Sequence, residues 1–173
     1  MTATIPFKQT NLSVVNVKTY LFSSLFVIGN IVLPQVCHLI PDGGRIFLPI
    51  YFFTLIASYK FGLKVGLLTA IFSPVINFLF FGMPTLGILP VILIKSSLLA
   101  IAASWIAGKS KSVSLLLIAL TILAYQLLGG VAEWLITADF TAAIQDFHLG
   151  FPGMLIQLIL GWALLKLMAD YEF

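Results

Sequence analysis

The chain has 173 residues, of which 61% are hydrophobic and only 9% are charged. A soluble domain would carry about 25% charged residues, so this composition excludes one and predicts an all-α integral membrane protein. The net charge of +3 rests on few groups and indicates topology rather than nucleic-acid binding. The single cysteine, Cys37, excludes an internal disulfide and a metal cage built from cysteines.

Six apolar segments predict one domain over residues 1–173, a six-helix transmembrane bundle. In chain order they cover residues 17–40, 46–59, 63–83, 86–107, 113–136 and 151–168. The second segment is short for a spanning helix, which predicts a bent or partly interfacial element. No apolar run leads to a small-residue cleavage site near the N-terminus, so the first helix is expected to act as the insertion signal.

The basic residues predict the orientation of this bundle. Lysines flank the first segment, the second and fourth connections and the end of the sixth segment; they are Lys8, Lys18, Lys60, Lys64, Lys109, Lys111 and Lys166. The other connections hold one basic residue, Arg45, beside Asp42, Asp139 and Asp146. Because cytoplasmic loops carry the excess of Lys and Arg, both termini are predicted to be cytoplasmic.

Lys95 is the most informative residue, because it lies inside the apolar fourth segment. A lysine near the middle of a spanning helix costs about 2.5–3.5 kcal/mol, so it needs a partner, a wet cavity or a ligand. The predicted depth below the outer helix end is on the order of 13 Å. Two interpretations remain open. Lys95 forms a packing ion pair, for which Glu133 is the obvious candidate, or it faces a ligand in a polar cavity.

Other polar side chains are predicted to gather in the same outer half of the membrane. They are Asn30, Gln35, His38, Asn77, Gln126, Glu133 and Gln157. Polar groups at one depth on several helices predict a cavity that opens to the outside. Gln126, Gly130 and Glu133 share one face of the fifth segment. Tyr51 and Trp134 are candidate walls for ring stacking, with an interfacial aromatic belt as the alternative.

Small residues recur every four positions along the fourth segment, at Ser96, Ala100, Ser104 and Gly108. They predict a ridge for close helix packing, with docking of a partner subunit as the alternative. Residues 38–49 and 80–90 are rich in Gly and Pro and predict a lid over the cavity. Cys37 and His38 resemble metal ligands, but neighbouring residues on a helix face different ways, and no metal or cofactor is predicted.

The runs Leu48-Pro-Ile-Tyr-Phe-Phe and Lys60-Phe-Gly-Leu-Lys-Val-Gly-Leu-Leu-Thr-Ala-Ile-Phe-Ser-Pro74 resemble the second and third helices of a known family. This family is the S components of energy-coupling-factor (ECF) vitamin transporters, and with size, topology and polar cluster the resemblance covers essentially the whole chain. It implies a substrate-binding subunit in the inner (plasma) membrane of a prokaryote, with its site beneath the first, third and fifth connections. The ligand is then a small water-soluble vitamin. The candidate substrate-binding residues are Lys95, Glu133, Gln126, Asn77, His38, Tyr51, Trp134 and Gln157.

The resemblance also implies partners, namely an ECF transmembrane coupling subunit and ATPase subunits. The chain has no Gly-Lys-Ser/Thr nucleotide loop, so ATP-driven work falls to such partners, and no enzymatic activity is expected. The first segment departs from the small-xxx-small spacing of the family, as at Ser23 and Val27. The contact of the first segment with a coupling subunit is therefore expected to differ from that of the family, or the protein works without dedicated coupling and ATPase subunits.

Two alternatives belong to other functional classes. A membrane scaffold protein of the MreD type resembles S components in helix count and size, but it would not need an intramembrane lysine. An intramembrane enzyme would need two facing carboxylates or a cluster of metal-binding aspartates. Asp42, Asp139 and Asp146 lie in connections without such spacing.

Overall fold

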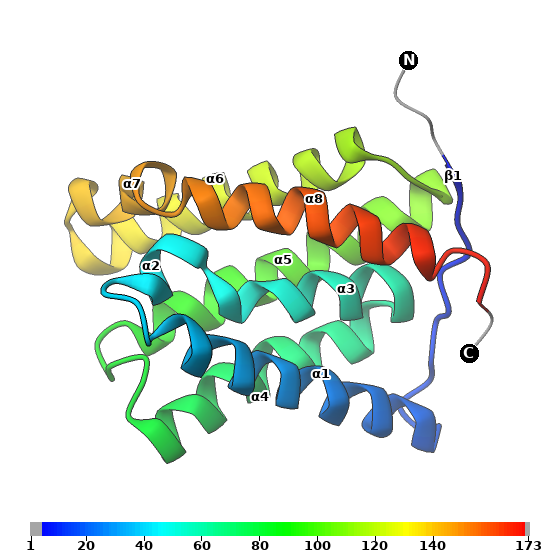
Figure 1. Cartoon of the computed structure of the whole chain (residues 1–173), viewed down its shortest axis with the longest axis horizontal. Helices are drawn as coiled ribbons and strands as arrows, with labels where there is room; N and C mark the ends of the chain where they lie inside the picture. Colours follow the sequence, from blue (N-terminus) through cyan, green and yellow to red (C-terminus); the bar gives the residue numbers. More distant parts are fainter. Residues whose placement is uncertain (1–4, 172–173) are drawn as a thin grey trace.

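The computed structural model describes residues 5–171, so the first four and last two residues of the predicted domain lie outside it. Within that range the chain forms a helical bundle with one short antiparallel strand pair (Figure 1). In chain order the elements are β1 (Ile5–Pro6), α1 (Val17–Cys37), α2 (Gly43–Phe47), η1 (Pro49–Tyr51), α3 (Phe52–Phe61), α4 (Leu63–Phe81), α5 (Leu89–Ser110), β2 (Ser112–Val113), α6 (Leu115–Thr137), α7 (Phe140–His148) and α8 (Phe151–Leu167).

Four helices, α1, α4, α5 and α6, are long and apolar enough to cross a membrane. A fifth span results if α7 and α8, which meet at 48°, are taken as one. These helices coincide with five of the six predicted segments to within a few residues. An all-α architecture with several membrane-spanning helices is thus confirmed, while the count of six spans and the cytoplasmic termini stay predictions.

The second predicted segment is divided into α2, η1 and α3. The break falls at Leu48, whose φ of 46° is left-handed, followed by Pro49, which has no backbone N–H. α3 has ten residues and is about 15 Å long, half the thickness of the hydrocarbon core. It is buried among α1, α4, α5 and α8 (Figure 1). The segment is bent, as the first of the two predicted alternatives has it, and α3 lies inside the bundle; the partly interfacial position stays a prediction.

A polar network joins α1, α3 and α4 at the start of α3. The Asn30 side chain accepts a hydrogen bond from the backbone N–H of Phe53 at 3.2 Å, which satisfies one of the donors that a helix start leaves unpaired. Asn77 donates to the backbone carbonyl of Asn30 at 2.9 Å and accepts from Gln35 at 3.3 Å. Asn30 and Gln35, expected around a ligand cavity, therefore hold helices together instead.

Residues 5–13, which we call the strap, cover the end of the bundle where both described termini lie (Figure 1). Phe7 and Leu12 are buried in the hydrophobic core. The backbone N–H of Thr10 donates to the carbonyl of Lys60 at 2.7 Å. The Gln9 side-chain amide donates to the backbone carbonyls of Ser58, Tyr59 and Ser104 at 3.1, 3.3 and 3.3 Å. The strap thus supplies hydrogen-bond donors to Tyr59 and Lys60 in the last turn of α3, where carbonyls lack partners within the helix.

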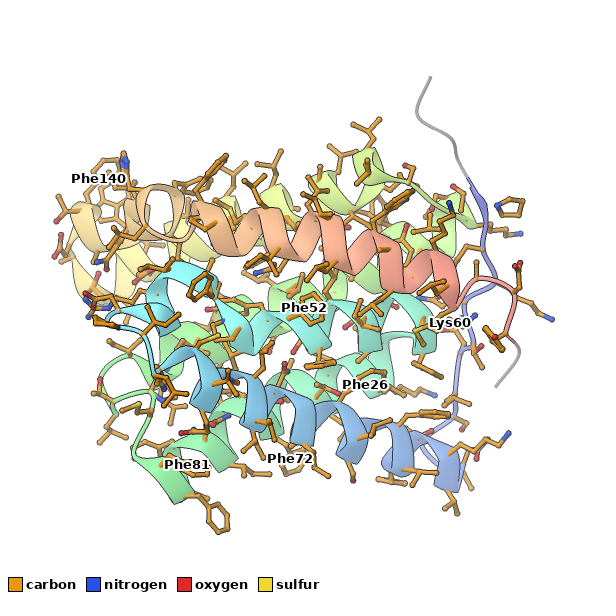
Figure 2. All side chains as sticks on the ribbon, viewed as in Figure 1. Phe26, Phe52, Lys60, Phe72, Phe81 and Phe140 are labelled. Carbon is orange, nitrogen blue, oxygen red and sulfur yellow. The ribbon has the colours of Figure 1, made fainter. Side chains whose placement is uncertain are left out.

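The outer surface of the bundle is apolar along its length. α1 exposes large side chains every three or four residues, at Val17, Leu21, Leu25, Ile28, Val32 and Val36. On α4, Phe72 and Phe81 point away from the bundle, whereas Phe26, Phe52 and Lys60 are buried (Figure 2). Soluble monomers rarely expose such continuous apolar surface, so this exterior fits contact with lipid.

The small-residue ridge of α5 is largely internal. Ser96 and Ala100 have no exposed area. Ser104 lies within hydrogen-bonding distance of Gln9 in the strap, and Gly108 lies beside the same side chain. The predicted packing role is therefore confirmed for Ser96 and Ala100. The alternative of subunit docking is wrong at these two residues, because neighbouring helices already cover them.

Candidate ligand-binding site

The end of the bundle opposite the strap, where α2 and α7 lie (Figure 1), is called the cavity end. A cavity of about 600 Å³ lies there. Its wall is formed by parts of segments 42–51, 83–88 and 137–146 and by the adjoining turns of α1, α4, α5 and α6. Pockets that hold small molecules have volumes of roughly 300–1,000 Å³. The titratable residues that line this cavity are His38, Asp42, Arg45, Tyr51, Lys95, Glu133 and Asp146.

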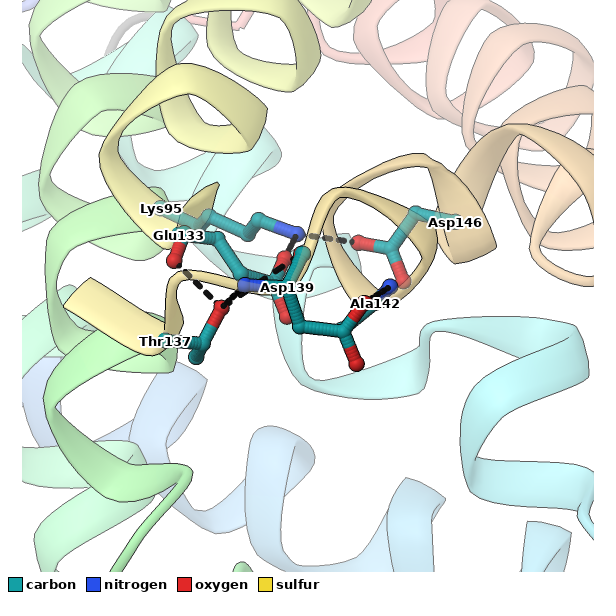
Figure 3. A network of polar contacts seen from close by, with 6 residues as sticks. All are labelled: Lys95, Glu133, Thr137, Asp139, Ala142 and Asp146. Atoms are coloured by element: carbon teal, nitrogen blue, oxygen red, sulfur yellow. Dashed lines mark hydrogen bonds and ion pairs between the residues drawn. The ribbon is translucent and has the colours of Figure 1, made fainter. Parts of the chain in front are cut away.

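Lys95 joins two carboxylates in the cavity wall (Figure 3). Its Nζ lies 2.5 Å from Glu133 Oε2 and 2.8 Å from Asp146 Oδ2. The exposed fractions of the three side chains are 3%, 14% and 20%, so this group, which we call the ion triad, is largely withdrawn from solvent. One ammonium and two carboxylates give the ion triad a formal charge of −1.

A glycine on α6 makes room for the lysine. A Cβ at Gly129 would lie 2.5 Å from Lys95 Cγ, so the lysine stem can rest against α6 only because this position has no side chain. Glu133 follows one turn later on the same helix face, which places its carboxylate beside the ammonium. The predicted pairing of Lys95 with Glu133 is therefore present.

Asp146 belongs to α7, which the sequence analysis treats as part of a connection. The Asp139 side chain accepts hydrogen bonds from the backbone N–H groups of Thr141 at 2.9 Å and Ala142 at 3.2 Å, and so caps α7. Figure 3 shows Asp139 beside Ala142. Together with the bond from the Thr141 hydroxyl, which is the strongest influence, these contacts lower the pKa of Asp139 from its ordinary value. α7 then brings Asp146 to the ammonium group.

The sequence does contain a signal for α7. Asp139 is a favourable N-cap residue, and apolar residues follow at Phe140, Ala143, Ile144 and Phe147, the spacing of one helix face. An amphipathic helix over these residues places Asp146 beside its apolar face. The pattern is only two turns long, much shorter than a membrane-spanning segment.

The cavity collects most of the predicted substrate-binding residues. Lys95, Glu133, Asn77, His38 and Tyr51 line it. Trp134 does not; it is 48% exposed and packs edge-on against Phe140, with 5.7 Å between ring centroids. An outward-facing tryptophan of this kind fits the interfacial alternative.

Gln126 and Gln157 also lie outside the cavity lining, in the interior of the bundle. Gln126 precedes Glu133 by seven residues, about 10 Å along the axis of α6, so the two share a helix face but not a depth. Gln157 accepts a hydrogen bond from the Tyr125 hydroxyl at 3.1 Å. Neither the nitrogen nor the oxygen of the Gln126 side-chain amide has a hydrogen-bond partner among the described residues.

Within the described residues, no group of three or more His, Cys, Asp or Glu side chains is placed to hold a metal ion. His38 lies over Gly44, where an added Cβ would come within 2.5 Å of His38 Nε2, and Cys37 does not line the cavity. Comparison of the chain with protein-family models, with curated proteins and with solved structures finds no match.

Proposed function

We propose that the protein is a substrate-binding membrane subunit that captures a small water-soluble molecule of the vitamin class for uptake, similar to the S components of ECF transporters. The observation that carries this proposal is a cavity of about 600 Å³ whose wall contains the ion triad. Ionisable residues buried at membrane depth are costly and mark ligand or ion pathways by default. A scaffold protein needs no such group next to an open cavity.

In this proposal the chain crosses the plasma membrane of a prokaryote six times, with α2, η1 and α3 together forming the second crossing. Both termini are cytoplasmic, and the cavity opens to the outside. The described termini lie at one end of the bundle, as an even number of crossings requires (Figure 1). The positive-inside rule supports the direction, because lysines cluster near the strap, whereas Asp42, Asp139 and Asp146 lie at the cavity end.

The energy for uptake comes from partners in this proposal. The chain binds its ligand alone, and ATPase subunits drive the transport step through a transmembrane coupling subunit. The lack of a Gly-Lys-Ser/Thr loop in the sequence supports the assignment of ATP hydrolysis to partner subunits. The exposed face of α1 is apolar, so an apolar helix of a partner subunit can pack on it in place of lipid.

Isothermal titration calorimetry on the purified protein tests the binding function with a panel of water-soluble vitamins. One member is expected to bind with one molecule per chain. A cavity-filling variant, Gly87→Trp, should abolish binding, because Gly87 lines the cavity and an added Cβ there meets nothing within 4 Å. Ile159→Trp, on the exposed face of α8, is the matched control.

Two results contradict the proposal. If the folded protein binds no vitamin of the panel, the scaffold alternative is favoured. Fast concentrative uptake into liposomes by the chain alone, driven by a proton or sodium gradient, would show that the proposed energy source is wrong even if the ligand is found.

A further inference from the structure

We infer that the cavity binds a small organic cation whose charged nitrogen carries N–H donors, such as a protonated amine, an amidine or a protonated nitrogen heterocycle. This inference rests on the proposed function and adds the chemical class of the ligand. It is carried by the charge of the ion triad, by its unused hydrogen-bond acceptors, and by the hydroxyl group of Tyr51.

The buried part of the cavity wall carries one negative charge more than it carries positive charges. The ion triad contains two carboxylates and one ammonium group. The other charged lining residues, Asp42 and Arg45, are exposed and opposite in sign, and His38 is likewise exposed. Water and salt screen these exposed charges, whereas the field of the partly buried ion triad is screened less. One positive charge on the ligand would neutralise the site, and an anion would be repelled.

The ion triad also retains free acceptors. Lys95 donates to one oxygen of each carboxylate, and Glu133 Oε1 and Asp146 Oδ1 accept no hydrogen bond from any described residue. An ionised carboxylate accepts hydrogen bonds at both oxygens and donates none. The open positions therefore suit N–H donors, and charge-assisted bonds of this type are the stronger class.

Tyr51 is independent evidence for a polar ligand at this place. Its side chain is only 3% exposed and lines the cavity, yet its hydroxyl forms no hydrogen bond with the described residues. It lines the same cavity as Asp146 and Glu133. Contact with the ring of Tyr125, at 5.3 Å between centroids, fixes its orientation. The hydroxyl is reachable from the cavity and has no partner among the described residues, so a ligand atom next to the cationic nitrogen would bond it in place of water.

Calorimetry on the full chain in lipid nanodiscs tests this class directly. The probes are pyridoxamine and benzamidine as cations with N–H groups on the charged nitrogen, riboflavin as a neutral molecule, and biotin, pantothenate and nicotinate as anions. One of the two cationic probes should bind with one molecule per chain. Glu133→Gln and Asp146→Asn should each weaken it about 10- to 100-fold, as expected for loss of a hydrogen bond to a charged group. Tyr51→Phe should weaken it up to about tenfold.

The carboxylate variants should still fold, because each keeps one carboxylate opposite Lys95. Asp170→Asn, at an exposed carboxylate near the strap, is the matched control and should leave the affinity unchanged. Tight binding of a neutral or anionic probe that Gly87→Trp abolishes would overturn the inference but leave the proposed function standing. Cation binding that both carboxylate variants leave intact would also overturn it. If none of the probes binds, the proposed function is overturned, and the inference with it.

Discussion

The two ends of the bundle contain hollows of nearly equal volume, about 600 and about 580 Å³, that differ in their chemistry. At the cavity end, Lys95 and two carboxylates are withdrawn from solvent in the wall. The hollow at the strap end has charged lining residues too, but Lys8, Lys111 and Asp170 are all exposed. Volume therefore does not distinguish the two hollows, whereas buried charge among their lining residues does.

The ends also differ in how completely their polar groups are satisfied. Near the strap, Gln9 and Thr10 supply donors to helix carbonyls. At the cavity end, the Tyr51 hydroxyl and one oxygen each of Glu133 and Asp146 have no partner among the described residues. The strap end is thus built for stability, and the cavity end keeps unused hydrogen-bonding capacity where a ligand would lie.

The largest expected effect comes from Lys95→Met, which removes the positive charge from the ion triad. Two carboxylates would then face each other without a cation, and breaking a buried ion pair in this way costs about 3–5 kcal/mol. The melting temperature of the purified protein should fall steeply. The matched control is the triple variant Lys95→Met, Glu133→Gln, Asp146→Asn, which should recover most of the loss. An unchanged melting temperature in the single variant would show that the ion triad is solvated.

Gly129→Ala should have the next largest effect. The added methyl group would lie 2.5 Å from Lys95 Cγ, so the lysine or α6 must move, and overpacking of this kind costs about 1–3 kcal/mol. Ligand affinity should fall together with the melting temperature, because the ammonium leaves its carboxylates. Gly87→Ala is the control, since an added Cβ there meets nothing within 4 Å. Equal melting temperatures for Gly129→Ala and Gly87→Ala would contradict the close packing of Lys95 against Gly129.

Gln9→Ala tests the strap end alone. The helix carbonyls that the Gln9 amide contacts would lose a donor, at a cost of about 1–3 kcal/mol if water cannot replace it. Hydrogen exchange should accelerate in the strap and in the last turn of α3. Affinity for ligand at the opposite end should remain that of the unaltered protein. A parallel loss of binding would mean that the two ends are coupled through α3.

Asp139→Ala should have the smallest effect, confined to α7. It removes the side chain that caps this helix, so amide exchange should increase over Thr141 and Ala142. Because the pKa of Asp139 is lowered in the folded protein, the stabilisation by its carboxylate is full above its ordinary value of 3.8 and is lost as pH falls through the lowered value. Identical amide exchange over α7 in the variant and in the unaltered protein at neutral pH would contradict the capping role.

Composition and hydrophobic runs were sufficient to predict the spanning helices, because lipid imposes long apolar segments. Depth and charge also predicted the pair of Lys95 and Glu133. The third member, Asp146, was missed because a two-turn amphipathic helix carries little signal beside the spanning segments. Gln126 shares the helix face of Glu133 but does not line the cavity, because a sequence reveals which helix face a residue shares but not how far the cavity reaches down that face.

The half-length helix α3 also constrains the order in which the protein can be assembled in the membrane. Its ten residues cannot cross the hydrocarbon layer unaided, and its backbone ends depend on Asn30 and on the strap. α8, which packs against α3, follows it late in the described part of the chain. α3 therefore enters its final environment only after α8 has been synthesised, so truncation before α8 should leave the second segment exposed to quality-control proteases.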